Sequence, residues 1–285
     1  MHHVSQARRL GAVSACCAVL IAALGGCAAT VATPSLNENA TSRAIPLDAT
    51  AGASSSPSLS MLPAVISTVA LGDSVPAGSV CGCLAFPEQV ASTLTSDLGR
   101  KTTVRNLAKG GFTTADVLAQ VTTDRTAMSE VAAANVVEVE IGANDAGYNN
   151  SCGTNIACYR PAVDAVSKNL PLILQRIDQL RHGKHTLVVL IDYWNAWLGG
   201  KYAAARGRAY VNAADSITDE INTVIMTTAS AHGSAYVDLQ TAFKGPNHAA
   251  DETPYLASDG DHPNAAGQAQ IAAATVAVIK KSLGV

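Results

Sequence analysis

The segment Gly72-Asp73-Ser74 carries a hydroxyl group where a catalytic nucleophile could act. An apolar, β-branched run that begins near Ile66 predicts a buried strand, which should end at Gly72. Ser74 would then lie at the carboxyl end of this strand, where parallel α/β sheets bind their ligands. A single serine at such a place is more commonly a turn or helix-capping residue. A nucleophilic role therefore requires a base, an acid that orients the base, and an oxyanion site elsewhere in the chain.

A loop near the end of the chain offers both the base and the acid. The imidazole of His262 could accept the proton of the Ser74 hydroxyl. The carboxylate of Asp259 could hold that imidazole in one tautomer, and Asp261 is a second carboxylate close by. In the alternative interpretation, Pro263-Asn264 only begins the last helix and His262 is a solvent-facing loop residue.

Candidate oxyanion donors follow the first three predicted strands. A tetrahedral intermediate needs preorganised donors, each worth about 3 kcal/mol. The candidates are the backbone N–H groups of Ser74 and Gly111 and the side-chain amide of Asn144. Gly111 suits this role because a residue without Cβ lets the backbone approach a substrate closely, and Gly110 is the alternative. Each of these residues could instead be an ordinary turn residue.

Strands and helices are predicted to alternate from residue 64 onward. The strands are expected at residues 66–72, 104–108, 136–141, 186–191 and 235–237, and the helices at 86–98, 114–121, 127–133, 162–182, 209–231 and 264–283. Loops follow the fourth and fifth strands at 192–197 and 241–263. Five strands separated by helices imply right-handed crossovers and a parallel sheet covered on both faces. The predicted fold class is α/β, a three-layer α/β/α sandwich for which 2-1-3-4-5 is a common strand order.

The carboxyl ends of all five predicted strands carry glycine or polar residues. Because these ends meet at one edge of a parallel sheet, the side chains should gather into a single site. The loop after the fourth strand contains Trp194 and Trp197, which either line an acyl pocket at this edge or cover the edge of the sheet. In the third strand, Glu138 and Glu140 would place two carboxylates on one face, which is unfavourable in a central strand.

Four short blocks carry a resemblance to a known family. They are Gly72-Asp73-Ser74, Asn106 with Gly111, Gly142-Ala143-Asn144-Asp145 and Asp259-Gly260-Asp261-His262. In this order the blocks resemble those of the SGNH (GDSL) hydrolase superfamily, including its exported bacterial esterases and lipases. Segments typical of other hydrolases or of nucleotide-binding proteins, such as G-x-S-x-G, H-E-x-x-H and G-x-x-x-x-G-K-[ST], do not occur.

The resemblance implies a flavodoxin-like fold and a serine esterase or lipase that works through an acyl-enzyme. It assigns Ser74, Asp259 and His262 to the catalytic triad, and Ser74, Gly111 and Asn144 to the oxyanion hole. It implies no metal and no organic cofactor. Two rival functions stay open: a carbohydrate O-acetyl esterase or acyltransferase with the same triad, and a surface binding protein without turnover.

The amino-terminal segment predicts export. Arg8 and Arg9 precede an apolar run over residues 11–24 that is too short for a comfortable membrane span and is typical of a signal peptide. The segment 1–27 ends at Cys27 in a sequence that resembles a bacterial lipobox, so Cys27 is a candidate for lipidation and membrane attachment. Alternatively, the segment is a plain signal peptide that is cleaved near Ala28 or Ala29, or an uncleaved anchor. The Ala/Ser/Thr/Pro-rich stretch 28–62 predicts a flexible linker before a catalytic domain at 63–285.

Four cysteines lie within the predicted domain. An exported protein meets an oxidising environment, so disulfides are favoured over free thiols. Cys152 and Cys158 enclose a short loop that a disulfide could close, whereas Cys81 and Cys83 either form a tight ring or pair with the other two. The spacings fit known zinc fingers poorly.

The composition limits the classes of partner. The chain has 285 residues, of which 48% are hydrophobic, and this suits one globular domain. A formal net charge of −3 and the lack of a basic run give no electrostatic support for nucleic-acid binding. The expected partner is a small acyl ester or lipid, bound by a monomer that is either secreted or held in the cell envelope as a lipoprotein.

Overall fold

The computed structural model describes residues 62–285, which contain the predicted catalytic domain. The predicted signal segment 1–27 with Cys27 and residues 28–61 of the predicted linker lie outside the described residues. None of the helices within 62–285 combines the length and the apolar character that a membrane span requires.

Five strands form one parallel sheet in the order β2-β1-β3-β4-β5. They are β1 (Val65–Gly72), β2 (Lys101–Asn106), β3 (Val136–Glu140), β4 (Leu187–Ile191) and β5 (Ala235–Val237). The order places β1 and β3 side by side at the centre, so the turn after β1 lies in the middle of the carboxyl edge. The predicted three-layer fold is confirmed, and the strand order, which the sequence alone does not determine, is the common 2-1-3-4-5 arrangement.

The second strand differs most from its prediction, because it begins at Lys101 and ends at Asn106 rather than covering 104–108. Its residues alternate between exposed and half-buried positions, as expected for an edge strand with one face on the protein. The apolar residues that follow it, Leu107 and Ala108, belong to the turn that leads to Gly110.

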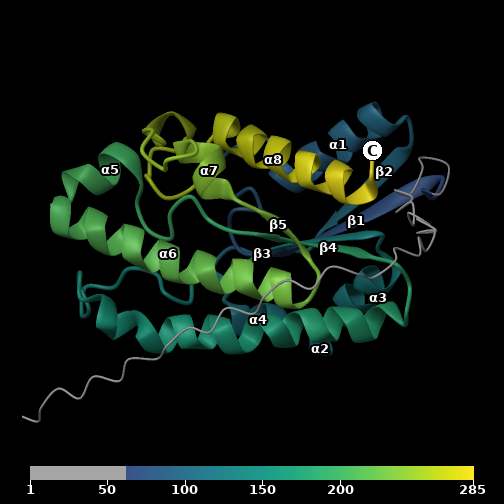
Figure 1. Ribbon diagram of the computed structural model, residues 1–285, viewed down its shortest axis with the longest axis horizontal. Helices are drawn as coiled ribbons and strands as arrows, with labels where there is room; N and C mark the ends of the chain where they lie inside the picture. The colour runs from purple at the N-terminus through teal and green to yellow at the C-terminus, as the bar shows by residue number, and fades with distance from the viewer. Residues whose placement is uncertain (1–61) are drawn as a thin grey trace, which may run out of the picture. The chain divides into compact units, whose positions relative to one another are not determined.

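Helices cover both faces of the sheet (Figure 1). One face carries α1 (Phe86–Leu98), α7 (Leu239–Lys244) and α8 (Ala265–Leu283), and the other carries α2 (Thr114–Thr123), α3 (Arg125–Ala133), α4 (Arg160–Arg181) and α6 (Arg208–Ala231). Short elements complete the chain, namely α5 (Gly200–Ala205) and the 3₁₀ helices η2 (Ile156–Tyr159) and η3 (Thr253–Tyr255).

The sequence did not predict α5 and α7, and the loop expected over 241–263 is partly helical. Each of these helices has only six residues, which is too short to show a helical apolar period. The side chain of Asp238 accepts a hydrogen bond from the Thr241 N–H at 2.8 Å and so begins α7.

Two apolar cores separate the sheet from its helices. The core beneath α2, α3, α4 and α6 contains Val137 and Val139 of β3, so Glu138 and Glu140 face α1 and α8. Both glutamates are fully buried, and none of their carboxyl oxygens has a hydrogen-bond partner within residues 62–285. The unfavourable placement expected from the sequence is therefore present in the strand.

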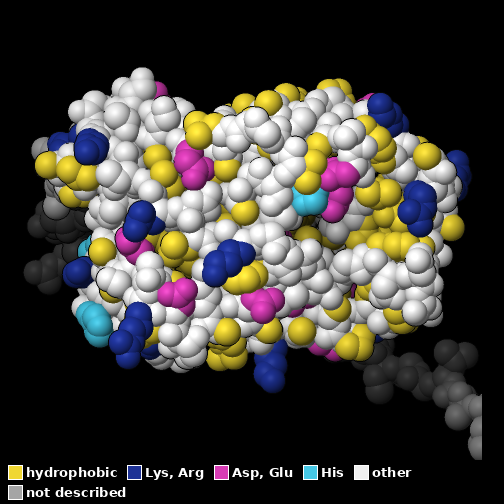
Figure 2. Space-filling view, turned by 180° about the vertical axis from the view of Figure 1, so that it is seen from behind, with side chains coloured by type: hydrophobic (Ala, Val, Ile, Leu, Met, Phe, Trp, Pro, Cys, Tyr) yellow, Lys and Arg dark blue, Asp and Glu magenta, His cyan; other side chains and the backbone are white. Residues whose placement is uncertain are grey.

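Disulfides join Cys81 to Cys83 and Cys152 to Cys158. The second is the pairing predicted from the sequence, and the first is the tight ring rather than the cross-pairing. All four sulfur atoms are thus engaged, and within the described residues no cluster of His, Cys, Asp or Glu is arranged to hold a metal ion. On the face drawn in Figure 2, Lys and Arg side chains are spread singly and form no continuous basic patch.

Candidate active site

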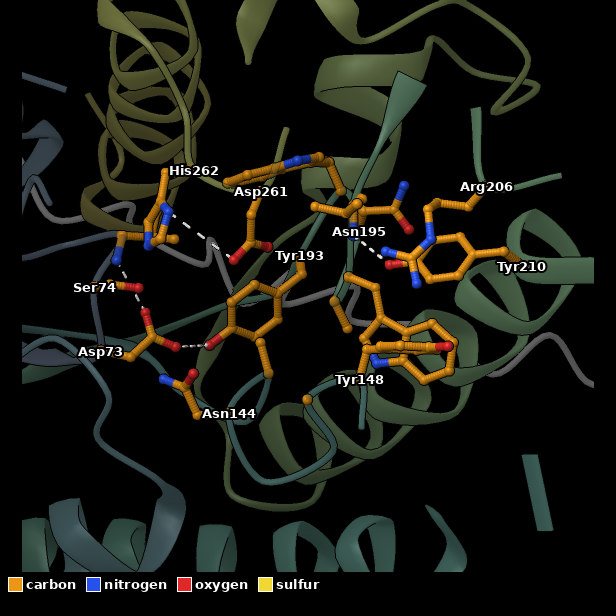
Figure 3. A pocket seen from close by; sticks show the side chains of 17 residues that line it. Asp73, Ser74, Asn144, Tyr148, Tyr193, Asn195, Arg206, Tyr210, Asp261 and His262 are labelled. Atoms are coloured by element: carbon orange, nitrogen blue, oxygen red, sulfur yellow. Dashed lines mark hydrogen bonds and ion pairs between the residues drawn. The ribbon is translucent and has the colours of Figure 1, made fainter. Parts of the chain in front are cut away.

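A cavity of about 350 Å³ opens at the carboxyl edge of the sheet. The predicted site residues that line it are Ser74, Asn144, Trp194, Trp197 and His262. Ser74 comes from the turn after β1, Asn144 from the loop after β3, and His262 from the loop before α8. Figure 3 shows Ser74 and His262 at one end of this cavity and Arg206 and Tyr210 at the other. The sheet therefore brings these residues to one edge, as the strand ends predict.

The Asp259 carboxylate holds both the ring and the backbone of His262. One carboxyl oxygen lies 2.7 Å from His262 Nδ1, and the other accepts the N–H groups of Asp261 and His262 at 3.1 Å. Burial raises the pKa of Asp259, but these hydrogen bonds outweigh it and bring that pKa below its usual value. An ionised acceptor at Nδ1 keeps the proton on that nitrogen and leaves Nε2 free to act as a base.

Asp261 is the second acid near His262, and its carboxylate lies farther from the imidazole than that of Asp259. Its carboxylate is 3.9 Å from His262 Nδ1, too far for a hydrogen bond, and it lines the cavity, which Asp259 does not. Burial raises the pKa of Asp261, and the neighbouring Asp259 charge adds to this effect. The geometry therefore favours Asp259 as the partner of the imidazole.

Gly260 allows this loop to pack closely against α5. Its φ is +77°, and a β-carbon there would lie 2.4 Å from the ring of Tyr202. The Gly260 carbonyl also accepts the Gly199 N–H at 2.8 Å, next to the first turn of α5. Only glycine fits this position. It lies in the chain between Asp259, which accepts the hydrogen bond from the imidazole, and His262, which bears the imidazole.

The turn that carries Ser74 is fixed by three polar contacts, of which two are buried and one is partly buried. Asp73 Oδ1 accepts the Val75 N–H at 3.0 Å, and Gln268 of α8 donates to the Val75 carbonyl at 3.0 Å. Asn106, at the end of β2, donates to the Pro76 carbonyl at 2.7 Å. The hydroxyl is thus carried by a turn whose backbone is anchored to β2 and α8.

The three candidate oxyanion donors are available for a ligand. Neither the Ser74 N–H nor the Gly111 N–H donates to an acceptor anywhere in the described part of the chain. Asn144 Nδ2 gives one hydrogen to the Phe112 carbonyl at 2.9 Å and keeps its second hydrogen free. A β-carbon at Gly110 would lie 3.9 Å from the Ser74 Cβ, so the peptide that joins Gly110 to Gly111 is close to the serine.

A buried acid lies directly beneath the serine. Asp73 is 1% exposed and accepts a hydrogen bond from Tyr193 Oη at 2.6 Å. Burial raises the pKa of Asp73 to about 6, although the bonds from Tyr193 and Val75 act against this shift. Asp192, one residue before the tyrosine, is also buried, and burial raises its pKa to about 7.

Aromatic rings form the wall of the cavity away from the histidine. Trp197 donates from Nε1 to the Ala146 carbonyl at 2.7 Å and packs at 5.1 Å, edge to face, against Tyr148. Trp194 lines the cavity as well, but its ring stacks on Phe243 at 4.4 Å. Both tryptophans are at most 2% exposed, so they shape the cavity wall while most of their surface is in the core.

Several of these side chains were not singled out from the sequence. Tyr193 and Gln268 belong to this group, together with Arg206 in the cavity wall. Gln268 had a detectable signal, because its spacing from Ile271 puts a polar residue on the apolar face of α8, where it is 0% exposed. Tyr193 and Arg206 lie in loops whose sequence has no periodic pattern.

The arrangement has the parts that acyl transfer needs. Ser74 and His262 share one cavity with Asn144, Gly111 lies outside the lining of that cavity, and the imidazole has an ionised partner. Within residues 62–285, Ser74 Oγ forms no hydrogen bond to His262; such contacts often close only when a substrate is bound.

Comparison with known proteins gives a consistent result. Residues 70–270 match the model of the GDSL-like Lipase/Acylhydrolase family. The chain is 28% identical to Lipase 1 of Streptomyces coelicolor over 152 residues, covering 47% of this chain and 56% of that protein. It is 30% identical to a lipase of Streptomyces rimosus over 183 residues, covering 57% of this chain and 65% of that protein. The matches therefore span less than two thirds of either relative.

Solved structures share the fold. An extracellular lipase from Streptomyces rimosus is 25% identical, with a TM-score of 0.58 over 76% of this chain and 99% of that chain. The lipase Lip_vut3 from a goat rumen metagenome is 21% identical, with a TM-score of 0.59 over 75% of this chain and 97% of that chain. The second likeness shows the fold alone.

Proposed function

Because the chain belongs to the GDSL-like lipase/acylhydrolase family, as its four sequence blocks predicted, we propose that it hydrolyses carboxylic esters with Ser74 as the nucleophile. The observation that carries the proposal is the contact of 2.7 Å between Asp259 and His262 Nδ1, in a loop whose imidazole lines the same cavity as Ser74. The printed names of both curated relatives, which are lipases, support the same reaction class.

Acylation begins with attack by Ser74 Oγ on the ester carbonyl carbon. His262 Nε2 takes the hydroxyl proton as the new C–O bond forms, and Asp259 stabilises the imidazolium. When the tetrahedral intermediate collapses, the bond to the alcohol oxygen breaks and His262 gives its proton to that oxygen. Water repeats the sequence on the acyl-enzyme, releasing the acid and restoring the serine.

The negative oxygen of each tetrahedral intermediate is held by the N–H groups of Ser74 and Gly111 and by the Asn144 amide. These donors have unused hydrogens in the described residues, which supports their assignment to the oxyanion. The acyl group lies in the cavity that Trp194 and Trp197 help to line.

The test is hydrolysis of p-nitrophenyl butyrate by Ser74→Ala. We expect kcat to fall by about 10⁴-fold or more with the circular dichroism spectrum unchanged, because the residual rate rests on binding and the oxyanion donors alone. Ser92→Ala, at an exposed position of α1, is the matched control and should keep full activity. A fluorophosphonate probe should label the wild type and not Ser74→Ala; labelling of both would reject Ser74 as the nucleophile.

A panel of esters identifies the natural class of substrate. It runs from acetyl to long-chain p-nitrophenyl esters and includes acetylated xylan. Highest kcat/KM for long chains would identify a lipase, and highest rates on acetylated xylan would identify a carbohydrate O-acetyl esterase.

We also propose that the protein is exported, on the basis of the signal-like segment 1–27 and of a structural relative described as an extracellular lipase. Attachment through a lipidated Cys27 is the finer proposal. Mass spectrometry of the mature amino terminus tests it, because a Cys27→Ser variant should lose the acyl groups and partition into the aqueous phase.

A further inference from the structure

A single cation lies in the cavity wall far from the catalytic residues. Arg206 lines the same cavity as Ser74 and His262, and Figure 3 shows it at the opposite end from both. It is the residue that follows α5 and caps its carboxyl end, and Gly207 separates it from the start of α6. A substrate that reacts at the serine and extends along the cavity therefore reaches this guanidinium.

Arg206 is held by aromatic rings and not by an acid. Its guanidinium carbon lies 5.1 Å from the ring centre of Tyr148 and 4.9 Å from that of Tyr210. None of the ion pairs among residues 62–285 includes Arg206. Its N–H donors consequently stay available for a ligand, and cation–π contact with two rings orients the group.

The rings that hold the guanidinium are themselves fixed. Tyr210 is 3% exposed, and its hydroxyl accepts the Leu198 N–H at 3.2 Å. Tyr148 packs against Tyr210 and Trp197, each at 5.1 Å between ring centres. Arg206 itself is exposed, but its guanidinium lies against fixed rings, which reduces the entropy that it loses when it binds an anion.

The charges in the cavity differ between its two ends. Asp73 and Asp261 lie at the catalytic end, where a carboxylate is 3.9 Å from His262 Nδ1. An anionic group on a substrate is repelled there, whereas the guanidinium attracts it at the far end. This polarity aligns an anionic ester in one direction, with its reacting carbonyl at Ser74 and its charge at Arg206.

We propose that Arg206, supported by Tyr148 and Tyr210, is a subsite for a carboxylate or phosphate group carried by the ester substrate. The inference rests on the proposed ester hydrolysis and names its substrate class as anionic esters. Guanidinium binds both anions in a bidentate manner, so the chemistry of the subsite is the same whether the charge belongs to the acyl part or to the alcohol part.

Matched pairs of esters that differ in one charge test the proposal. The acyl arm compares p-nitrophenyl hydrogen adipate and suberate with their neutral methyl esters. The alcohol arm compares butyrylglycerol phosphate with monobutyrin. We expect the wild type to favour the charged member of at least one pair, and the arm that shows the preference identifies the source of the anion.

The variants separate charge from packing. In Arg206→Gln the ratio of kcat/KM for the charged over the neutral ester should fall by about 10-fold or more, since one charge-assisted hydrogen-bonded contact contributes selectivity of that order. Arg206→Lys should keep part of the preference because it keeps the charge. Arg208→Gln, at the exposed start of α6, should leave both rates at the wild-type level.

Binding without turnover separates this inference from the proposed function. With Ser74→Ala as background, calorimetry with hydrogen suberate esters should give a Kd that weakens about 10-fold or more on adding Arg206→Gln. If the wild type shows no esterase activity, binding of that kind would retain the subsite and reject the hydrolase. No preference for the charged ester in either arm, or an unchanged ratio in Arg206→Gln, would overturn the subsite.

Discussion

Tyr193 Oη donates a hydrogen bond of 2.6 Å to Asp73 Oδ2, and both side chains are buried beneath the Ser74 turn. Asp73 follows β1 and Tyr193 follows β4, two strands that are separated in the sheet by β3. The bond therefore spans the central strand and joins two loops of the catalytic edge. It also offsets part of the burial that raises the pKa of Asp73 to about 6.

Replacing this tyrosine tests whether the bond positions the nucleophile. Tyr193→Phe leaves a buried carboxyl oxygen without its donor, which costs about 1–3 kcal/mol of unfolding free energy. The loss should be larger at about pH 8 than at about pH 5, because the bond stabilises the ionised acid. Because the turn that carries Ser74 is then less well fixed, we expect kcat to fall by about 3-fold to 10-fold, whereas KM should change less.

Urea unfolding at the two pH values and steady-state kinetics measure these effects. Tyr255→Phe is the matched control, because this half-buried ring contacts Phe243 and its hydroxyl has no hydrogen-bond partner within the described residues. Equal losses of stability at both pH values would show that Tyr193 does not interact with an ionised Asp73.

Replacing Asp259 should lower kcat far more than replacing Asp261, the other acid beside His262. Asp259→Asn replaces the acceptor at His262 Nδ1 with an amide and so favours the wrong tautomer, which lowers kcat by about 10²-fold to 10⁴-fold. Asp261→Asn removes a carboxylate 3.9 Å away that makes no hydrogen bond to the ring, so kcat on neutral esters should change by less than about 5-fold. If Asp261→Asn is the more damaging of the two, Asp259 is not the partner of the imidazole.

The residues proposed to carry out the chemistry could be singled out because each belongs to a local pattern. Ser74 follows an apolar run that could only be a buried strand, and His262 lies in a loop with Asp259 three residues away. Strand ends of a parallel sheet meet at one edge, so local placement along the chain was enough to bring the residues together.

The supports of the site were not predictable in the same way. Tyr193 and Asp73 are 120 residues apart, and Gln268 reaches Val75 across 193 residues. Neither contact leaves a spacing that a single sequence can show. Arg206 lies next to α5, whose six residues are too few for a periodic pattern, so its place in the cavity depends on packing alone.

Gly260 should be essential for activity because any side chain at this position would collide with Tyr202. Its freedom to adopt a positive φ is only part of the reason. In Gly260→Ala, the new methyl group would lie 2.4 Å from the Tyr202 ring at a φ of +77°. The loop must shift to avoid this collision, and the shift displaces Asp259 and His262 relative to Ser74. We therefore expect kcat to fall by about 10-fold or more. Positive φ by itself costs an alanine about 1–2 kcal/mol.

Gly233→Ala separates the two contributions. Gly233 also has a positive φ, +63°, but a β-carbon there meets no described atom within 4 Å. This control should lose stability and keep kcat. Thermal unfolding and esterase kinetics of both variants give the comparison, and equal activity in the two would show that the Tyr202 contact does not hold the catalytic loop.

Glu138 should make the protein less stable as the pH rises. Burial, with a smaller contribution from the Glu88 charge, raises its pKa from 4.5 to about 8. Between these values the unfolded chain is ionised at this residue while the folded chain holds a proton. As the pH rises through this range, Glu138 therefore lowers the unfolding free energy by about 1.4 kcal/mol per pH unit. Its effect levels off above about pH 8, where the folded chain is ionised as well.

The variant Glu138→Gln isolates this contribution, because Asp73 and Asp192 add their own slopes and are present in both proteins. The amide cannot ionise, so the variant should lose less stability than the wild type between about pH 5 and about pH 8 and be the more stable of the two at the upper value. Urea unfolding at several pH values measures the difference, with Glu220→Gln on α6 as the control.

Parallel stability profiles for wild type and Glu138→Gln would mean that Glu138 is already ionised in the folded protein. In that case a positive group or water must reach its carboxylate, which has no partner among residues 62–285.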